Sequence, residues 1–202
     1  MAADPDWGRD FDPDRLARLE LRGWKAYYRH QPARLFALLV LVNREQARTT
    51  WPMALVAAFH LARAAVGFGR SDGDYDRFLP DIERGYRALG VAPDRLSDVA
   101  RCELRWWVVR REIGATAGAA AGTAITALYT ALYLVPEEIV AEAGRLRGLA
   151  AEIRDRGANA DPEGPAGPGQ AYWPKVAQLL RTAYRSLRNG LDRATPPAEG
   201  LS

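Results

Sequence analysis

Two glutamates occur in matching local phrases, Glu20-Leu21-Arg22-Gly23-Trp24 and Glu103-Leu104-Arg105-Trp106-Trp107. If both phrases are helical, each glutamate falls at the centre of an otherwise apolar face. An ionised carboxylate removed from water without compensation loses several kcal/mol or more. Each of these side chains therefore requires a cation, a metal ion, a proton or a ligand nearby.

Steps of three and four residues define the inward faces of the two expected helices. Glu20, Trp24 and Tyr27 share one face of the first helix, and the basic residues of that segment gather on the opposite side. Further polar residues of the predicted interior lie on other helices. The candidate polar core or ligand site comprises Glu20, Trp24, Tyr27, Glu45, His60, Arg63, Glu103, Trp107 and Arg110.

Three kinds of chemistry fit this set. A di-metal bundle needs Glu-x-x-His pairs, and the chain has none and only two histidines. A buried network in which Arg63 or Arg110 pairs with the glutamates would fix the packing of the helices. A ligand pocket would use the same groups to orient a small polar or amphipathic molecule among aromatic rings. We expect the arginine network, with the pocket as an open alternative.

A calcium-loop pattern occurs once, and only in part. Its acids are Asp72, Asp74, Asp76 and Glu83, at loop positions one, three, five and twelve. Arg77 stands where the sharp turn needs glycine. Because acids also cap helix starts, we predict no metal site here. If a metal ion did bind, these four residues would be the weak candidates for its ligands.

Familiar catalytic templates are missing from the sequence. It contains no phosphate-binding P-loop, no dinucleotide glycine fingerprint, no nucleophile elbow and no His-Glu-x-x-His. The single cysteine, Cys102, excludes an internal disulfide. Catalytic residues and cofactors stay unknown, and so does whether the chain is an enzyme.

Helix signals dominate the elements that must position these residues, and strand alternation is nearly absent. We predict an all-α, single-domain bundle of about six to seven helices. Prolines at helix starts and glycines after helix ends define the segments. The expected helices cover about 14–30, 32–46, 52–68, 80–89, 93 onward, 123–134, 136–156 and 174–192. The helix over 52–68 is apolar on nearly all sides, which is typical of a central helix.

The domain organisation follows from composition. Residues 1–13 form a flexible arm that Trp7 and Phe11 could pin to the body, and residues 14–156 form the helical core. A Gly/Pro-rich linker, 157–171, precedes a basic amphipathic helix, 172–193, that docks on the core, and 194–202 form a disordered tail. Pro13-Asp14-Arg15-Leu16 and Pro93-Asp94-Arg95-Leu96 precede the two glutamate phrases, which suggests an approximate internal twofold repeat.

Composition limits the remaining functions. The chain has 202 residues, 48% of them hydrophobic, and a net charge of +3, which is too small to indicate nucleic-acid binding. The sequence contains no run of about 18 uncharged apolar residues, which membrane insertion would require. We therefore expect a soluble, cytoplasmic protein.

We predict a non-catalytic binding or interaction protein that self-associates or has a protein partner, with a small-molecule ligand as a further option. One alternative is a helical enzyme that uses Glu20 and Glu103 with His60 as metal ligands or acid/base groups. A second is nucleic-acid binding through the basic C-terminal helix.

Overall fold

The computed structural model describes residues 7–160 and 171–194, and within them the chain forms eight α-helices and no strand. The all-α prediction is confirmed, and the described chain has eight helices where about six to seven were predicted. The helices are α1 (Pro13–Tyr28), α2 (Pro32–Ala47), α3 (Trp51–Arg70), α4 (Leu79–Ala88), α5 (Leu96–Ile113), α6 (Gly118–Tyr133), α7 (Glu137–Ala160) and α8 (Trp173–Ala194). Short 3-10 turns, Tyr75–Phe78, Pro93–Arg95 and Gly114–Thr116, precede α4, α5 and α6.

The helix starts follow the sequence signals. The Asp12 carboxylate accepts hydrogen bonds from the backbone N–H groups of Asp14 and Arg15, and so caps α1. Proline lies in the first turn of α1, α2, α3 and α4, where its missing N–H is not needed. The chain leaves α2 through Arg48, whose φ of 51° is left-handed. These local features explain why most predicted boundaries lie within a few residues of the observed ones.

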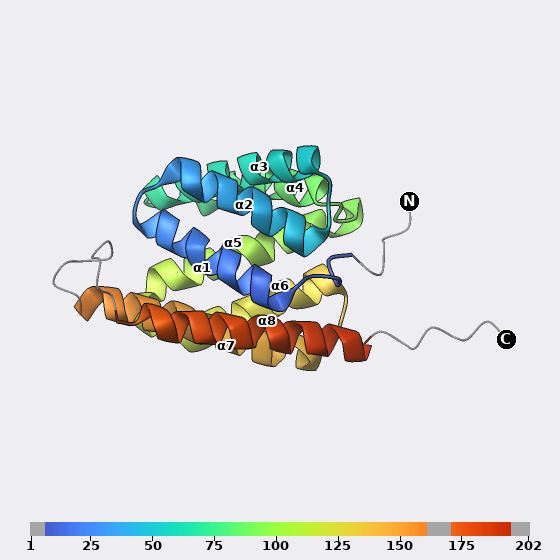
Figure 1. Cartoon of the computed structure of the whole chain (residues 1–202). Coiled ribbons are helices and arrows are strands. Elements are labelled where there is room, and N and C mark those ends of the chain that lie inside the picture. Colours follow the sequence, from blue (N-terminus) through green and yellow to red (C-terminus); the bar gives the residue numbers. More distant parts are fainter. Residues whose placement is uncertain (1–6, 161–170, 195–202) are drawn as a thin grey trace.

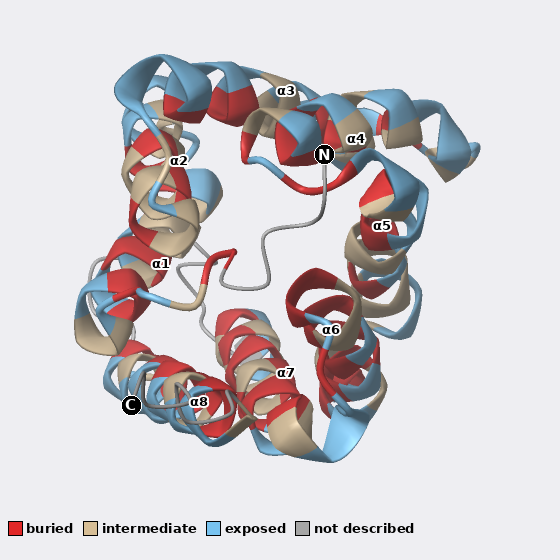
Figure 2. Cartoon of the chain, turned by 90° about the vertical axis from the view of Figure 1, so that its right-hand side faces the viewer, coloured by how far each residue is buried: buried red, intermediate tan, exposed pale blue. Residues whose placement is uncertain are grey.

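The eight helices close into a ring. Each helix packs on the next one along the chain, and α8 packs on α1 (Figure 1). Viewed from the end at which α1 begins, the helices are arranged as a ring, with α3 and α4 running across the view, and residues 7–12 lie inside the ring at that end (Figure 2). Because consecutive helices alternate in direction, the C-terminal ends of α1, α3, α5 and α7 meet at the opposite end of the ring.

Glycines allow two neighbouring helices of the ring to approach closely. A Cβ at Gly148 in α7 would collide with the backbone of Gly118 and Gly122 in α6. The Ala/Gly-rich segment that precedes and opens α6 therefore both interrupts the helices and permits tight α6–α7 packing.

The prediction that α3 is central is wrong. Its buried residues are four alanines, Ala54, Ala57, Ala58 and Ala64, while Trp51 is 52% exposed and Phe59 is 54% exposed. Several large apolar side chains thus lie on the outside of the ring, while the alanines, together with Leu61 and Phe68, face inward. Among the described residues, α3 is the one helix whose length and apolar composition would also suit a membrane span.

The ends of the described chain bear on the predicted domain boundaries. Trp7 and Phe11 are buried, and the Trp7 indole donates a 2.6 Å hydrogen bond to the Leu89 carbonyl oxygen. Helix α7 continues to Ala160, beyond the predicted end at residue 156. The predicted apolar stripe of α8 is buried against α7 and α1. Residues 1–6, 161–170 and 195–202, which hold the first six residues of the predicted arm and most of the predicted linker and tail, lie outside the described residues, and the internal repeat stays a prediction.

Gly148→Ala should destabilise the protein by about 1–3 kcal/mol, because the new methyl group meets rigid backbone of α6. Gly23→Ala is the matched control: no atom lies within 4 Å of its added Cβ, so alanine should stabilise α1 by about 0.5–1 kcal/mol. Urea unfolding followed by circular dichroism measures both values. Equal effects of the two substitutions would contradict the close α6–α7 packing.

Candidate functional site

A cavity of about 560 Å³ occupies the centre of the ring and is lined by residues from all eight helices. Its volume lies within the range of about 300–1,000 Å³ that is usual for small-molecule sites. Most of its wall is aromatic or aliphatic. Its exposed rim comprises Tyr27, Gly69, Arg111 and Asn159, from the C-terminal ends of α1, α3, α5 and α7. The mouth therefore opens at that end of the ring.

Six of the nine predicted site residues line this cavity, and three do not. The six are Glu20, Trp24, Tyr27, Glu103, Trp107 and Arg110. Both glutamates point inward as their spacing predicts, with Glu20 7% exposed. The structure thus brings the two glutamate phrases to one site from helices that are more than 80 residues apart in the chain.

Glu20 pairs with Arg147 of α7, and not with the expected Arg63 or Arg110. The Arg147 Nε and Nη2 atoms lie 2.9 and 2.5 Å from Glu20 Oε1. Burial lowers the pKa of Arg147, but the charge of Glu20 and the neighbouring phenol groups outweigh this effect and raise it well above its ordinary value. Burial and the Glu20 carboxylate likewise raise the pKa of Tyr184, which stays neutral. Arg147 therefore stays protonated at any physiological pH.

Glu103 is held by neutral donors. The Tyr86 hydroxyl donates a 2.8 Å hydrogen bond to Glu103 Oε2, and the Trp107 indole donates a 3.0 Å bond to Oε1. Burial and the Glu103 charge raise the pKa of Tyr86 well above its ordinary value, so the phenol keeps its proton. Within the described chain Glu103 forms no ion pair, so the arginine solution predicted for the glutamates is wrong here.

A second polar group lies nearer the mouth. Arg110 of α5 binds Asp155 of α7 through two hydrogen bonds of 2.8 and 2.7 Å, and it also donates to the Tyr28 hydroxyl at 2.5 Å. Arg154 adds a 2.7 Å contact to Asp155 and stacks on the Tyr28 ring. Burial raises the pKa of Asp155, but Arg110 and Arg154 more than offset this and hold it below its ordinary value of 3.8.

The two polar groups form successive layers along the same three helices. We call Glu20, Glu103 and Arg147 the deep cluster, and Tyr28, Arg110 and Asp155 the outer cluster. Corresponding members are seven or eight residues apart on α1, α5 and α7, which is about 10–12 Å along a helix. Between the clusters the wall is aromatic, so the cavity has an apolar middle with polar groups at two depths.

Three buried polar atoms on the cavity wall have no hydrogen-bond partner among the described residues. They are Glu20 Oε2, the Trp106 indole Nε1 and Asn43 Nδ2. Buried polar atoms are usually paired, because an unpaired one loses about 1–3 kcal/mol. One acceptor and two donors are therefore available to a molecule in the cavity.

His60 and Arg63, which were predicted to join the glutamates, lie elsewhere. Both bind Asp81 of α4 on the side of the ring formed by α3 and α4: the His60 Nδ1 atom is 3.2 Å from Asp81 Oδ1, and Arg63 Nε is 2.7 Å from Oδ2. Neither lines the cavity. The prediction was wrong because the face of α3 that carries His60 and Arg63 does not point into the cavity.

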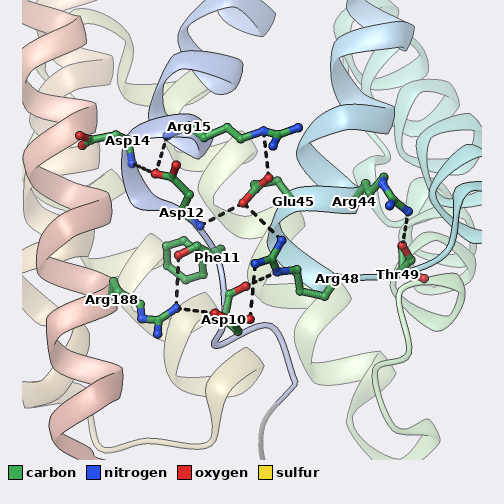
Figure 3. Close-up of polar contacts among 10 residues, drawn as sticks. All are labelled: Asp10, Phe11, Asp12, Asp14, Arg15, Arg44, Glu45, Arg48, Thr49 and Arg188. Carbon is green, nitrogen blue, oxygen red and sulfur yellow. Dashed lines mark hydrogen bonds and ion pairs between the residues drawn. The ribbon is translucent and has the colours of Figure 1, made fainter.

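Glu45 is buried, but it belongs to another polar cluster (Figure 3). It accepts a 3.0 Å hydrogen bond from the backbone N–H of Asp12 and lies 3.0 Å from Arg15 Nε. Arg48 contacts both Glu45 and Asp10. This cluster fixes the segment before α1 to the end of α2 and contributes nothing to the cavity.

Metal ligands are not gathered in the described part of the chain. Across residues 7–160 and 171–194, no group of three or more His, Cys, Asp or Glu side chains is placed to hold an ion. Asp72, Asp74, Asp76 and Glu83, the weak calcium candidates, therefore do not form such a group, and neither do Glu20, Glu103 and His60.

Sequence reasoning missed Arg147, Tyr86 and Asp155. A signal for Arg147 was present: it falls on the buried stripe of α7 at three- and four-residue steps from Val140, Ala143 and Ala150. A charged residue in a buried stripe needs a partner of opposite charge or a ligand, as the two glutamates do. Tyr86 and Asp155 carried no comparable signal.

Comparisons with protein-family models, curated proteins and solved structures find no match for this chain.

Asp155→Asn should reduce the free energy of unfolding by about 3–5 kcal/mol at neutral pH, because it leaves Arg110 buried without its anion. Since the folded-state pKa of Asp155 is depressed, its contribution is complete above about pH 4 and disappears as the pH falls further. The difference between variant and wild type should therefore shrink in acid. Denaturant unfolding at pH 7 and pH 3 measures it.

Asp14→Asn is the control, because it breaks the exposed ion pair with Arg185. It should change stability much less than Asp155→Asn at pH 7. Equal losses for the two variants, or a difference for Asp155→Asn that does not shrink in acid, would contradict the assigned role of Asp155.

Proposed function

We propose that the protein binds a small amphipathic molecule inside the ring of helices. The observation that carries this proposal is the cavity itself: about 560 Å³, apolar through its middle, with charged groups at two depths and a mouth at one end. Helix bundles commonly place ligand sites in their cores, between inward-facing side chains.

Energetic arguments support a use for the cavity beyond folding. Unfilled space in a core is destabilising, by roughly 24 cal/mol per Å³ of cavity volume in model substitutions. A buried ion pair is also weak evidence for stability, since apolar residues of similar size often do as well. Here the space and the charges occur together, in a wall that also keeps three polar atoms unpaired. Binding accounts for this combination more simply than packing does.

The two alternative functions find less support. An enzyme using Glu20, Glu103 and His60 would need the three side chains in one place, and His60 is bound to Asp81 outside the cavity. For nucleic-acid binding, the basic face of α8 is partly neutralised, because Arg185 pairs with Asp14 and Arg188 pairs with Asp10 and Asp192. The expected self-association stays a prediction.

The neutral fluorophore N-phenyl-1-naphthylamine tests the proposal, because its emission rises in an apolar site. Wild-type protein should bind it saturably, at one site. Ala65→Phe places a ring in the cavity from α3 and should weaken binding at least about tenfold, which corresponds to ~1.4 kcal/mol. Fluorescence titration measures the affinity, and circular dichroism checks that the variant folds.

Two controls separate the cavity from the surface. Ala127→Phe adds the same ring at an exposed position of α6, and Phe59→Ser removes a ring from the exposed face of α3. Both should leave probe binding unchanged. If Phe59→Ser abolishes binding while Ala65→Phe has no effect, the probe binds the outer face and the proposed function is wrong.

A further inference from the structure

We infer that the molecule bound in the cavity is a cation, an amphipathic amine whose ammonium group lies at the deep cluster. This inference rests on the proposed function and specifies its ligand. It follows from how the charges of the cavity wall are already paired.

The deep cluster contains two carboxylates and one guanidinium. Arg147 commits both its Nε and its Nη2 atoms to a single oxygen of Glu20. The other oxygen, Oε2, is unpaired, on a side chain that is 8% exposed. The Tyr184 phenol lies beside this carboxylate, yet Oε2 itself accepts no hydrogen bond from the described residues, so a donor of a ligand can bind there, and a charged donor gains most.

Glu103 adds a charge that no cation among the described residues contacts. Its two hydrogen bonds come from the neutral Tyr86 hydroxyl and Trp107 indole. Arg147 is near enough that Glu103 also raises its pKa, so the three charges share one region. The deep cluster as a whole carries one formal negative charge more than its arginine neutralises.

Two arginines of the wall, Arg110 and Arg111, have few free donors for an anionic ligand, because their N–H groups are already bound. Arg110 is bound to Asp155 through two hydrogen bonds and to Tyr28 through a third. Arg111, at the rim, donates to the carbonyl oxygens of Phe68 and Gly69. An anionic ligand would have to displace a carboxylate or a backbone oxygen from these groups, whereas an ammonium meets free acceptor capacity.

Aromatic rings and helix ends favour the same charge. Trp24, Trp106, Trp107 and Tyr129 line the cavity, and Arg110 or Arg147 already lies over three of these rings, as expected from the attraction of their negative faces for cations. The mouth is formed by four helix C-termini, which carry the negative ends of the helix dipoles. The unpaired donors of Trp106 and Asn43 suit a neutral oxygen acceptor elsewhere on the same ligand.

Three indole compounds of similar size separate the charge of the ligand from its shape: tryptamine, tryptophol and indole-3-propionate. Isothermal titration at neutral pH should give tryptamine an affinity at least about tenfold higher than that of the alcohol or the acid. The comparison uses wild-type protein, so it does not depend on the folding of a variant. Tightest binding of the alcohol or the acid would overturn the inference.

Glu103→Gln then tests where the ammonium binds. It keeps the size of the side chain and leaves no arginine unpaired, so the fold should persist. The substitution should weaken tryptamine at least about tenfold and leave tryptophol nearly unchanged. Glu45→Gln is the control, because Glu45 is a buried glutamate outside the cavity, and it should alter neither affinity. An unchanged tryptamine affinity in Glu103→Gln would contradict the assigned position.

The outcomes distinguish this inference from the proposed function. If all three indoles bind equally and Ala65→Phe weakens them all, the cavity is a binding site and the cation assignment is wrong. If neither the indoles nor the neutral fluorophore binds, both statements are wrong.

Discussion

The Glu20–Arg147 ion pair is the interaction on which the interior of this protein depends. It joins α1 to α7, two helices that are separated in the ring by α8, and it lies where water has little access. Breaking such a pair by removing one partner leaves a buried charge and typically destabilises a protein by about 3–5 kcal/mol. Because whole domains are stable by only about 5–15 kcal/mol, loss of either partner would remove a large part of the stability of the ring.

The architecture concentrates charge on one set of helices. All the charged residues that line the cavity come from α1, α5 and α7, which run in the same direction and end at the mouth. Helices α2 and α6 contribute mainly leucines to the wall, and α4 and α8 contribute the tyrosines Tyr86 and Tyr184. The cavity is thus asymmetric, with charged walls on three helices and uncharged walls, mostly apolar or phenolic, on the others. That asymmetry would orient an amphipathic ligand.

Local periodicity explains which parts of this arrangement could be predicted from the sequence. Glu20, Trp24, Glu103 and Trp107 face inward because a helix repeats every 3.6 residues, and this property needs no knowledge of the partner helix. The partner of Glu20 could not be predicted in the same way, since Arg147 is 127 residues further along the chain and reaches it only when the ring closes.

Composition was a poorer guide than periodicity. Helix α3 is apolar on nearly all sides, and a sequence pattern cannot show which of those sides a neighbouring helix will cover. The structure covers the side with alanines, because small residues allow neighbouring helices to pack closely, and it leaves Phe59 and Trp51 outside. The same error misplaced His60 and Arg63, and with them the enzyme hypothesis that relied on an imidazole beside the two glutamates.

The central claim is that the ring binds an amphipathic cation with its head at the deep cluster, and a crystal structure with 5-bromotryptamine tests it most directly. Anomalous scattering locates the bromine independently of the interpretation of weak density. The account predicts one bromine peak within the cavity and the ammonium within hydrogen-bond distance of Glu20 Oε2 or of Glu103. A peak only on the outer face of α3, or an ammonium turned toward the mouth, would contradict it.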